Sequence, residues 1–253
     1  MLLAIDAGNT HIKVGVYQGP QLLAKWRMIP ENFGPLDEYG TELLRMFDRS
    51  GLDARKVEAI IVASVVPRLN PGLQLMSDRY FKLTPSFVDH TTSTGLKLLY
   101  DQPSELGADR IVSALAAVEK YGVPCIVIDF GTATTFNVIN SQREFLGGII
   151  APGIMTAAEA LFSRAAKLPP VPIERPEKLI GTSTVEAMQS GLFYGYASLV
   201  DGLIKRLMDH DINSATVVAT GGLAHLIQGA SEHTYQIDEN LTLDGLRIIH
   251  ERA

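Results

Sequence analysis

The chain has 253 residues, enough for one large domain or two smaller ones, and its 46% hydrophobic and 20% charged residues are ordinary for a globular protein. A net charge of -6 and the lack of any basic run argue against a sequence-independent nucleic-acid surface, because phosphate binding needs clustered Lys and Arg. No apolar run approaches the roughly 18 residues of a membrane span, and the N-terminus lacks a basic signal region, so we expect a cytoplasmic protein with no membrane segment.

The single cysteine, Cys125, lies in the apolar stretch Val123–Ile128 and has no second cysteine with which to form an internal disulfide. We expect it to be a small buried hydrophobe in a central strand. A reducing compartment is the natural setting for such a chain.

The first half of the chain begins with three expected strands in an antiparallel meander. Residues 1–17 read as two of them and Gln21–Met28 as the third. Tyr39–Phe47 carries apolar residues at helical spacing, and Val57–Val65 is a continuous apolar run typical of a strand buried on both faces. The remaining elements are a helix at Leu73–Phe81 and a short strand at Pro85–Asp89.

The second half repeats this order, with a long helical stretch at Thr184–His210. Its other elements are helices at Arg110–Tyr121, from Pro152-Gly153 and from Leu223, and strands at Cys125–Asp129, Phe136–Asn140, Glu144–Ile150 and Ala215–Ala219. Both halves read β-β-β-α-β-α. This predicts a duplicated α/β fold of two halves, residues 1–112 and 113–253, with the functional site in a cleft between them.

A similar polar turn follows the first strand of each half. Asp6 ends one apolar strand and Asp129 ends the other, and glycine and threonine follow each before the next strand. One Asp-x-Gly is most simply a tight turn, but two copies in the same order indicate a shared role. Glycine lets backbone approach a bulky anion, and a carboxylate can hold Mg²⁺ that phosphates also ligate. We therefore expect a nucleotide site. The glycine turn of Val217–Leu223 suits a close approach of the backbone to the base or ribose of the nucleotide.

A third candidate lies between these turns, in Gly107-Ala108-Asp109-Arg110, where a helix is expected to begin. Asp109 can be interpreted as a capping carboxylate that complements the helix dipole. It can equally be a general base that accepts a proton from a substrate hydroxyl attacking a γ-phosphate. Arg110 would form an ordinary salt bridge in the first case and grip an anionic substrate or the transferring phosphoryl group in the second.

The long helix opens with the spacing of a capping box, through Ser183 and Glu186 or through Thr182 and Val185. Exposed N–H groups at such a terminus also bind carboxylates or phosphates, so Thr184 is a candidate substrate contact.

In the first turn, Lys13 is a stronger candidate than His11 for a contact with phosphate, because it carries a full charge. The sequence has no P-loop, no G-x-G-x-x-G fingerprint, no H-E-x-x-H and no Cys/His cluster, so a structural metal is not expected.

Together these segments resemble the type III pantothenate kinases of the acetate and sugar kinase/Hsp70/actin superfamily. The resemblance spans nearly the whole chain. The first Asp motif is shared across the superfamily, whereas G-A-D-R combined with D-F-G-T-A-T-T and G-G-x-I-x-P-G is much more specific. The motifs are Asp6–Thr10, Ala63–Pro67, Gly107–Arg110, Asp129–Thr135, Gly147–Gly153, Gly181–Thr184 and Ala219–Gly222.

The resemblance implies a duplicated actin-like (ribonuclease H-like) fold, a homodimer, and ATP-dependent phosphorylation of pantothenate to 4′-phosphopantothenate, the first step toward coenzyme A. It implies Mg²⁺ with the ATP, for which Asp6 is a candidate ligand, and a monovalent cation, K⁺ or NH₄⁺, held by Asp129. Asp109 would accept the proton. The implied ATP-binding residues are Asp6, Ala7, Gly8, Asn9, Thr10, His11, Ile12, Lys13 and Thr132, and the implied pantothenate-binding residues are Tyr100, Gly107, Ala108, Asp109, Arg110 and Thr184.

Two other functions stay open on the residues alone. A phosphohydrolase on the same superfamily fold would position water in place of a substrate hydroxyl, and a closed pantothenate pocket containing Arg110 would argue against it. A catalytically idle ligand sensor would be expected to lose Asp109 or the Gly/Thr turns, all of which are present.

The helical stretch Thr184–His210 has more apolar residues than one face of a surface helix requires. The plain interpretation is a core helix, and the dimeric family predicts that it lies at or near a two-fold interface. These residues are Leu192, Phe193, Tyr196, Leu199, Val200, Leu203 and Leu207.

Overall fold

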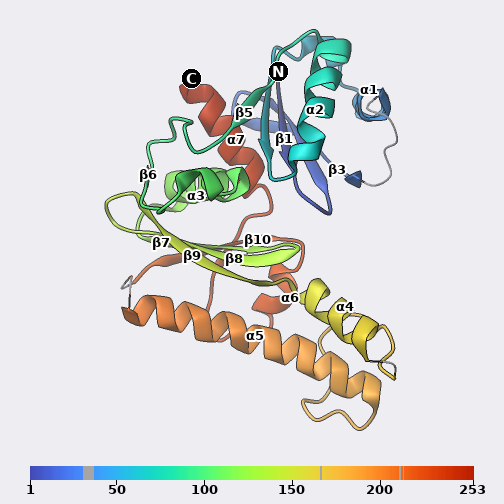
Figure 1. Ribbon diagram of the computed structural model, residues 1–253, viewed down its shortest axis with the longest axis vertical. Coiled ribbons are helices and arrows are strands. Elements are labelled where there is room, and N and C mark those ends of the chain that lie inside the picture. Colours follow the sequence, from blue (N-terminus) through green and yellow to red (C-terminus); the bar gives the residue numbers. More distant parts are fainter. Residues whose placement is uncertain (31–36, 166, 211, 213) are drawn as a thin grey trace. The chain divides into compact units, whose positions relative to one another are not determined.

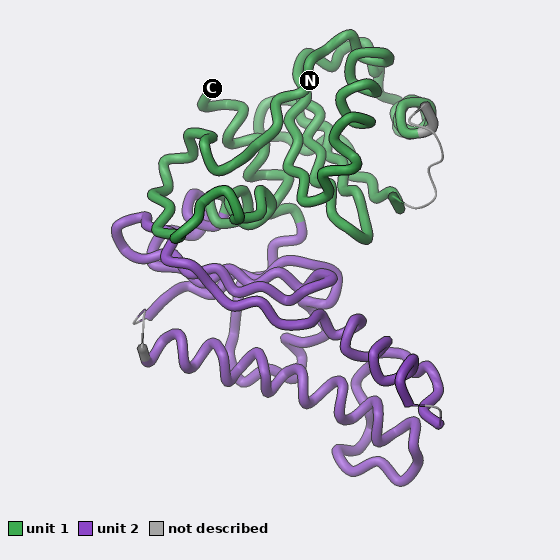
Figure 2. The backbone as a smooth tube through the Cα atoms, viewed as in Figure 1, with its two compact units in different colours: residues 1–116, 240–253 green, residues 117–239 purple. Residues whose placement is uncertain are grey.

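The computed structural model of the chain describes residues 1–30, 37–165, 167–210, 212 and 214–253. It divides into two compact units (Figure 2). Unit 1 comprises Met1–Ala116 and Asn240–Ala253, and unit 2 comprises Ala117–Glu239. The expected division at residue 112 differs from this because it leaves the C-terminal segment in the second half, whereas the helix formed by that segment packs on the first sheet.

Unit 1 is built on a sheet with the strand order β3-β2-β1-β4-β5 (Figure 1). The first three strands form the expected antiparallel meander, and β4 and β5 continue the sheet in parallel to β1. The strands are β1 Leu2–Ala7, β2 Ile12–Gln18, β3 Gln21–Met28, β4 Ala59–Ser64 and β5 Ser86–Val88, followed along the chain by the short β6 Lys97–Leu98.

Helices cover both faces of this sheet. Because side chains alternate along a strand, Leu3 and Ile5 of β1 face α1 and α2, whereas Leu2 and Ala4 face α3 and α7. Asp6 continues the second series and lies on the α3/α7 face. The helices are α1 Asp37–Arg49, α2 Asn70–Met76 with a π-helical continuation at Ser77–Phe81, α3 Ala108–Tyr121, which runs from unit 1 into unit 2, α7 Leu241–Arg252, and short 3₁₀ turns at Ala54–Lys56, Pro67–Leu69 and Pro103–Glu105.

Unit 2 repeats the topology of unit 1, with the strand order β9-β8-β7-β10-β11. β8 is antiparallel to β7 and β9, and β10 and β11 run parallel to β7. The duplication expected from the sequence is therefore confirmed strand by strand. The strands are β7 Cys125–Phe130, β8 Ala133–Ile139, β9 Glu144–Pro152, β10 Thr216–Gly221 and β11 Gln236–Ile237.

The long helix α5 (Thr184–His210) packs along one face of the unit 2 sheet, and α4 (Ile154–Arg164) and α6 (Ala224–Gln228) complete this unit. Val200 and Ile204 of α5 are buried against Ile126 and Ile128 of β7, so the plain interpretation of α5 as a core helix is confirmed. Of the seven apolar residues named from the sequence, Leu199 and Leu203 are only partly buried. None of the helices in the described ranges has the length and hydropathy that a membrane span requires.

Cys125 is a buried free thiol at the start of the central strand β7, as expected. Burial raises the pKa of this thiol to about 12, so it stays protonated near neutral pH. The final helix α7 and the short strands β6 and β11 were not anticipated from the sequence.

Candidate active site

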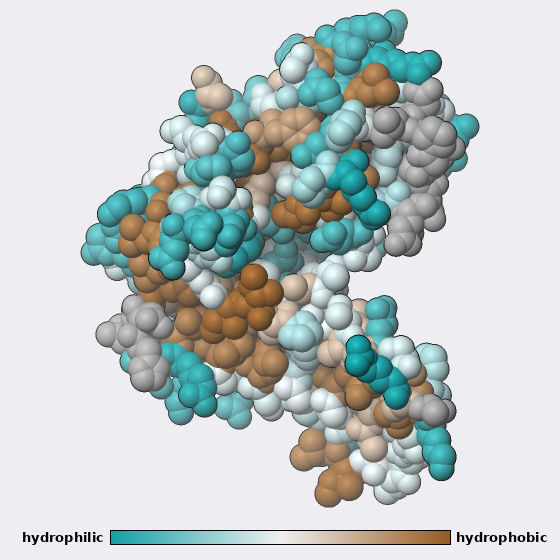
Figure 3. Space-filling model, viewed as in Figure 1, coloured by the Kyte–Doolittle hydropathy of each residue, from teal (hydrophilic) through white to brown (hydrophobic). Residues whose placement is uncertain are grey.

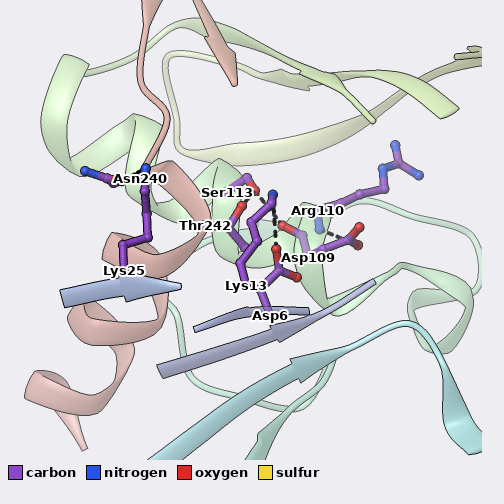
Figure 4. Close-up of polar contacts among 8 residues, drawn as sticks. All are labelled: Asp6, Lys13, Lys25, Asp109, Arg110, Ser113, Asn240 and Thr242. Atoms are coloured by element: carbon purple, nitrogen blue, oxygen red, sulfur yellow. Dashed lines mark hydrogen bonds and ion pairs between the residues drawn. The ribbon is translucent and has the colours of Figure 1, made fainter. Parts of the chain in front are cut away.

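The first polar turn joins β1 to β2 and brings Asp6 beside Lys13. The two residues are register partners across the hairpin, and Lys13 Nζ lies 3.3 Å from Asp6 Oδ2 (Figure 4). The Gly8 N–H donates to the His11 carbonyl at 3.0 Å and closes the turn. A Cβ at Gly8 would lie 3.1 Å from that same oxygen, so glycine suits the close approach. A buried carboxylate and a lysine thus stand at the base of a turn whose tip, Asn9 and Thr10, is exposed.

His11 lies in the same turn and is partly exposed. Desolvation, then the nearby Arg27 and Lys13, lower its pKa. The imidazole is therefore neutral at neutral pH, and Lys13 is the better cationic contact for a phosphate.

The first turn of α3 carries Asp109 and Arg110. The Arg110 N–H donates to Asp109 Oδ1 at 2.8 Å, so the carboxylate does satisfy a backbone donor at the helix start. A Cβ at Gly107 would lie 2.5 Å from the same Oδ1, which is why a glycine precedes this turn. The Asp109 side chain remains partly exposed. The capping and catalytic interpretations are compatible, because a carboxylate held in one orientation is well placed to accept a proton.

Arg110 is buried, and its guanidinium carbon lies 5.8 Å from the centroid of the Tyr100 ring. This cation–π contact fixes the arginine next to Asp109. The structure therefore brings together Tyr100, Gly107, Asp109 and Arg110, four of the residues expected to bind substrate, within unit 1.

The second polar turn joins β7 to β8. Asp129 is the last but one residue of β7, as Asp6 is of β1, and it pairs with Thr135 on β8 and Thr220 on β10. Because Ile128 and Phe130 face α5, Asp129 lies on the opposite face of the sheet with these two threonines. A carboxylate and two hydroxyls on neighbouring strands form an oxygen-rich patch of the kind that hard cations prefer.

Thr132 is exposed in this second turn, and the start of α4 holds the turn in place. The Thr132 carbonyl accepts the Gly153 N–H at 2.9 Å and the Thr156 hydroxyl at 2.8 Å. A Cβ at Gly153 would lie 2.3 Å from the Gly131 carbonyl oxygen. Sequence reasoning assigned Gly153 no role beyond its motif and missed Thr156, although a Pro-Gly pair between a strand and a helix is a signal for a tight junction.

Thr184 is exposed at the start of α5, and the expected capping box is present. The Glu186 N–H donates to Ser183 Oγ at 3.3 Å, and the Ser183 N–H donates to Glu186 Oε2 at 3.2 Å. Hydrogen bonds from Thr182, and a weaker one from Ser183, lower the pKa of Glu186. In Figure 1, α5 begins beside the end of α4 that lies away from the sheet, and Met188 and Leu192 of α5 lie in one apolar cluster with Ala158 of α4.

Comparison with known proteins decides the family. A family profile described as type III pantothenate kinase matches residues 2–206. The chain belongs to the type III pantothenate kinase family. The type III pantothenate kinase of Anaeromyxobacter sp. (strain Fw109-5) is 50% identical over 252 residues, covering 100% of this chain and 99% of that protein. The one from Koribacter versatilis is 47% identical over 262 residues, covering 100% of this chain and 96% of that protein.

Among solved structures, component A of the (R)-2-hydroxyglutaryl-CoA dehydratase of Acidaminococcus fermentans has a similar fold, with a TM-score of 0.58. The match covers 100% of this chain and 96% of that chain at 15% identity, so it supports the duplicated actin-like fold and nothing beyond the fold.

Type III pantothenate kinases, as kinases, use ATP together with a divalent metal ion. Within the described ranges, no group of three or more His, Cys, Asp or Glu side chains is arranged to hold a metal ion. A Mg²⁺ that arrives with the nucleotide fits this donor set, because Mg²⁺ commonly takes one or two carboxylates and completes its shell with phosphates and water. Asp6 is the carboxylate that the first turn offers.

Proposed function

We propose that this chain transfers the γ-phosphate of ATP to the primary hydroxyl of pantothenate, producing 4′-phosphopantothenate on the route to coenzyme A, with Asp109 as the general base. One observation carries the assignment of the base. The Arg110 N–H orients the Asp109 carboxylate at 2.8 Å, and the buried Arg110 guanidinium lies 5.8 Å from the centroid of the Tyr100 ring. Family membership names the substrate.

A free hydroxyl is a weak nucleophile, so the reaction gains from a carboxylate that accepts its proton as the phosphoryl group transfers. Asp109 plays that part, while Arg110 and Tyr100 bind the substrate beside it. Lys13 neutralises phosphate charge at the first turn, and bound Mg²⁺ neutralises more of it. We assign ATP binding to residues 6–13 together with Thr132, and pantothenate binding to Tyr100, Gly107, Ala108, Asp109, Arg110 and Thr184.

The direct test is a coupled assay of ADP release by the purified chain, with and without pantothenate. We expect release that depends on pantothenate and matches the amount of 4′-phosphopantothenate formed. Equal release without pantothenate would instead identify a phosphohydrolase. ATP binding with no release under either condition would identify a ligand sensor.

We further propose that turnover needs a monovalent cation, K⁺ or NH₄⁺, held near Asp129. The carboxylate shares one face of the sheet with Thr135 and Thr220, and a triphosphate near it would be repelled without a cation. We expect turnover in K⁺ or NH₄⁺ to exceed turnover in Na⁺ alone, and Thr220→Val to raise the K⁺ concentration needed for half-maximal rate. Equal rates in all three salts would contradict the proposal.

We propose that the chain forms a homodimer through unit 2. Most of the apolar surface of α5 is used by the core, but other large apolar side chains of this unit are exposed. Leu179 and Ile180, at 66% and 80% exposure, precede α5, and Figure 3 shows apolar atoms gathered over that segment. The other exposed large apolar residues in the described part of unit 2 are Ile150, Met155, Leu161 and Val185.

Light scattering at micromolar concentration should give twice the mass of one chain. The double substitution Leu179→Lys with Ile180→Lys should lower this mass toward that of a monomer, because two charges would have to be buried in the interface. Leu75→Lys is the matched control, since Leu75 is 44% exposed in unit 1. A monomeric mass for the unmodified chain would refute the homodimer.

A further inference from the structure

We propose that Ser113 and Thr242 form a buried hydroxyl pair that positions Asp109, so that the C-terminal helix α7 sets the placement of the general base. This inference rests on the proposed function, in which Asp109 accepts the proton of the substrate hydroxyl. It assigns a positioning role to two residues to which the proposed function gives no contact with ATP or pantothenate.

The pair is linked to Asp109 by a short chain of hydrogen bonds, all within unit 1 (Figure 4). Ser113 lies one turn after Asp109 on α3, and its hydroxyl donates to the Asp109 carbonyl at 2.7 Å. The same Ser113 oxygen lies 3.2 Å from Thr242 Oγ1 at the start of α7. A serine that bonds to the carbonyl four residues earlier adjusts the local geometry of its helix, here at the turn that carries the base.

The burial of this hydroxyl pair makes it sensitive to the position of α7 along α3. Ser113 is 2% exposed and Thr242 is 3% exposed, and the contacts around them are apolar, with Val112 of α3 and Leu243 and Leu246 of α7 in one cluster. Apolar contacts tolerate small slides of one helix along another. Leaving a buried hydroxyl without its hydrogen-bond partner costs free energy, so the pair favours one register of α7 against α3.

A second observation shows how closely the two helices meet. A Cβ at Gly245 of α7 would lie 2.2 Å from the Val112 carbonyl oxygen and 2.7 Å from Val112 Cγ1. The backbone of α7 therefore contacts the residue before Ser113 directly. Because no side chain separates the two backbones at this point, a shift of α7 toward α3 displaces α3.

The helix α7 is also tied to the sheet that carries Asp6 and Lys13. The Tyr17 hydroxyl of β2 donates to Asp244 Oδ1 at 2.9 Å, and Lys25 Nζ of β3 donates to Asn240 Oδ1 at 2.8 Å. These bonds anchor the start of α7 to the strands on one side, and the hydroxyl pair anchors it to α3 on the other. Helix α7 thus links the sheet that carries Asp6 and Lys13 to the helix proposed to supply the base.

The test uses Thr242→Val, which keeps the shape of the side chain and removes the hydroxyl, and Ser113→Ala. Because small misplacements of a catalytic group are costly, we expect each to lower kcat about tenfold while the KM values for ATP and pantothenate change less than about twofold. Thr242→Ser keeps the hydroxyl and should restore kcat to within about twofold of wild type. The double variant should lose no more than either single one, because both break the same link.

Ser77→Ala is the matched control. Ser77 is another fully buried serine of unit 1, and its hydroxyl also donates to a carbonyl four residues earlier, that of Leu73, at 2.7 Å. We expect it to lower the melting temperature as Ser113→Ala does, but to leave kcat per folded molecule unchanged.

Combination with Asp109→Asn separates this inference from the proposed function. If Asp109→Asn loses activity and Thr242→Val then causes no further loss in that background, the pair acts through Asp109. If Asp109→Asn alone is active, the assignment of the base fails. If Asp109→Asn is inactive but Thr242→Val and Ser113→Ala keep full kcat, or if Thr242→Ser is as impaired as Thr242→Val, the base stands and the positioning role is overturned.

Discussion

Replacing Asp109 with asparagine should reduce turnover by at least about 100-fold while the melting temperature and ATP affinity stay near wild type. The asparagine carbonyl can still accept the Arg110 N–H that now bonds to Oδ1, so the start of α3 keeps its satisfied donor. The amide cannot take a proton from an attacking hydroxyl. The measurements are kcat from the coupled ADP assay, thermal unfolding, and calorimetric ATP binding.

Asp101→Asn is the control for this substitution, because Asp101 is an exposed carboxylate a short distance earlier in the chain with no proposed role. It should keep full activity. If Asp109→Asn keeps most of its activity, or loses activity only because it unfolds, then Asp109 is a helix cap and another group must accept the proton.

Gly153→Ala should lower kcat/KM for ATP by at least about tenfold and destabilise the chain by about 1–3 kcal/mol. The new methyl group would lie 2.3 Å from the Gly131 carbonyl oxygen and 2.5 Å from that of Thr132. Both are backbone atoms, so the second turn itself must move. Gly153 has φ -66° and ψ 154°, which alanine adopts freely, so the effect comes from the clash alone.

The control is Gly202→Ala in α5, where an added Cβ meets nothing within 4 Å. This change should be neutral or slightly stabilising, because alanine is the better helix former. Steady-state kinetics with varied ATP and chemical denaturation measure both variants. A wild-type kcat/KM for ATP in Gly153→Ala would contradict a part for the second turn in nucleotide binding.

The features that the sequence determined are local or periodic. Once residues 2–7 are assigned to a strand, the alternation of side chains along it places Asp6 on the face opposite Leu3 and Ile5, and the repeated strand-Asp-Gly-Thr order is enough to indicate the duplication. The start of α3 next to Asp109 and the capping box of Ser183 and Glu186 could also be predicted, because a helix terminus is satisfied by residues within one turn of it.

Only the tertiary structure decided which distant segments meet. Helix α7 was not anticipated, and no local pattern indicates that the segment after residue 240 returns to unit 1, where its apolar residues cover β1. The Ser113–Thr242 pair and the contact of Gly245 with Val112 depend on where α7 packs, and the contact of Gly153 with Gly131 depends in the same way on how the start of α4 meets the second turn. Periodicity fixes which side of an element is buried, because it is set by the local backbone. The partner on that side is selected by the packing of the whole core, to which residues far apart in the chain contribute together.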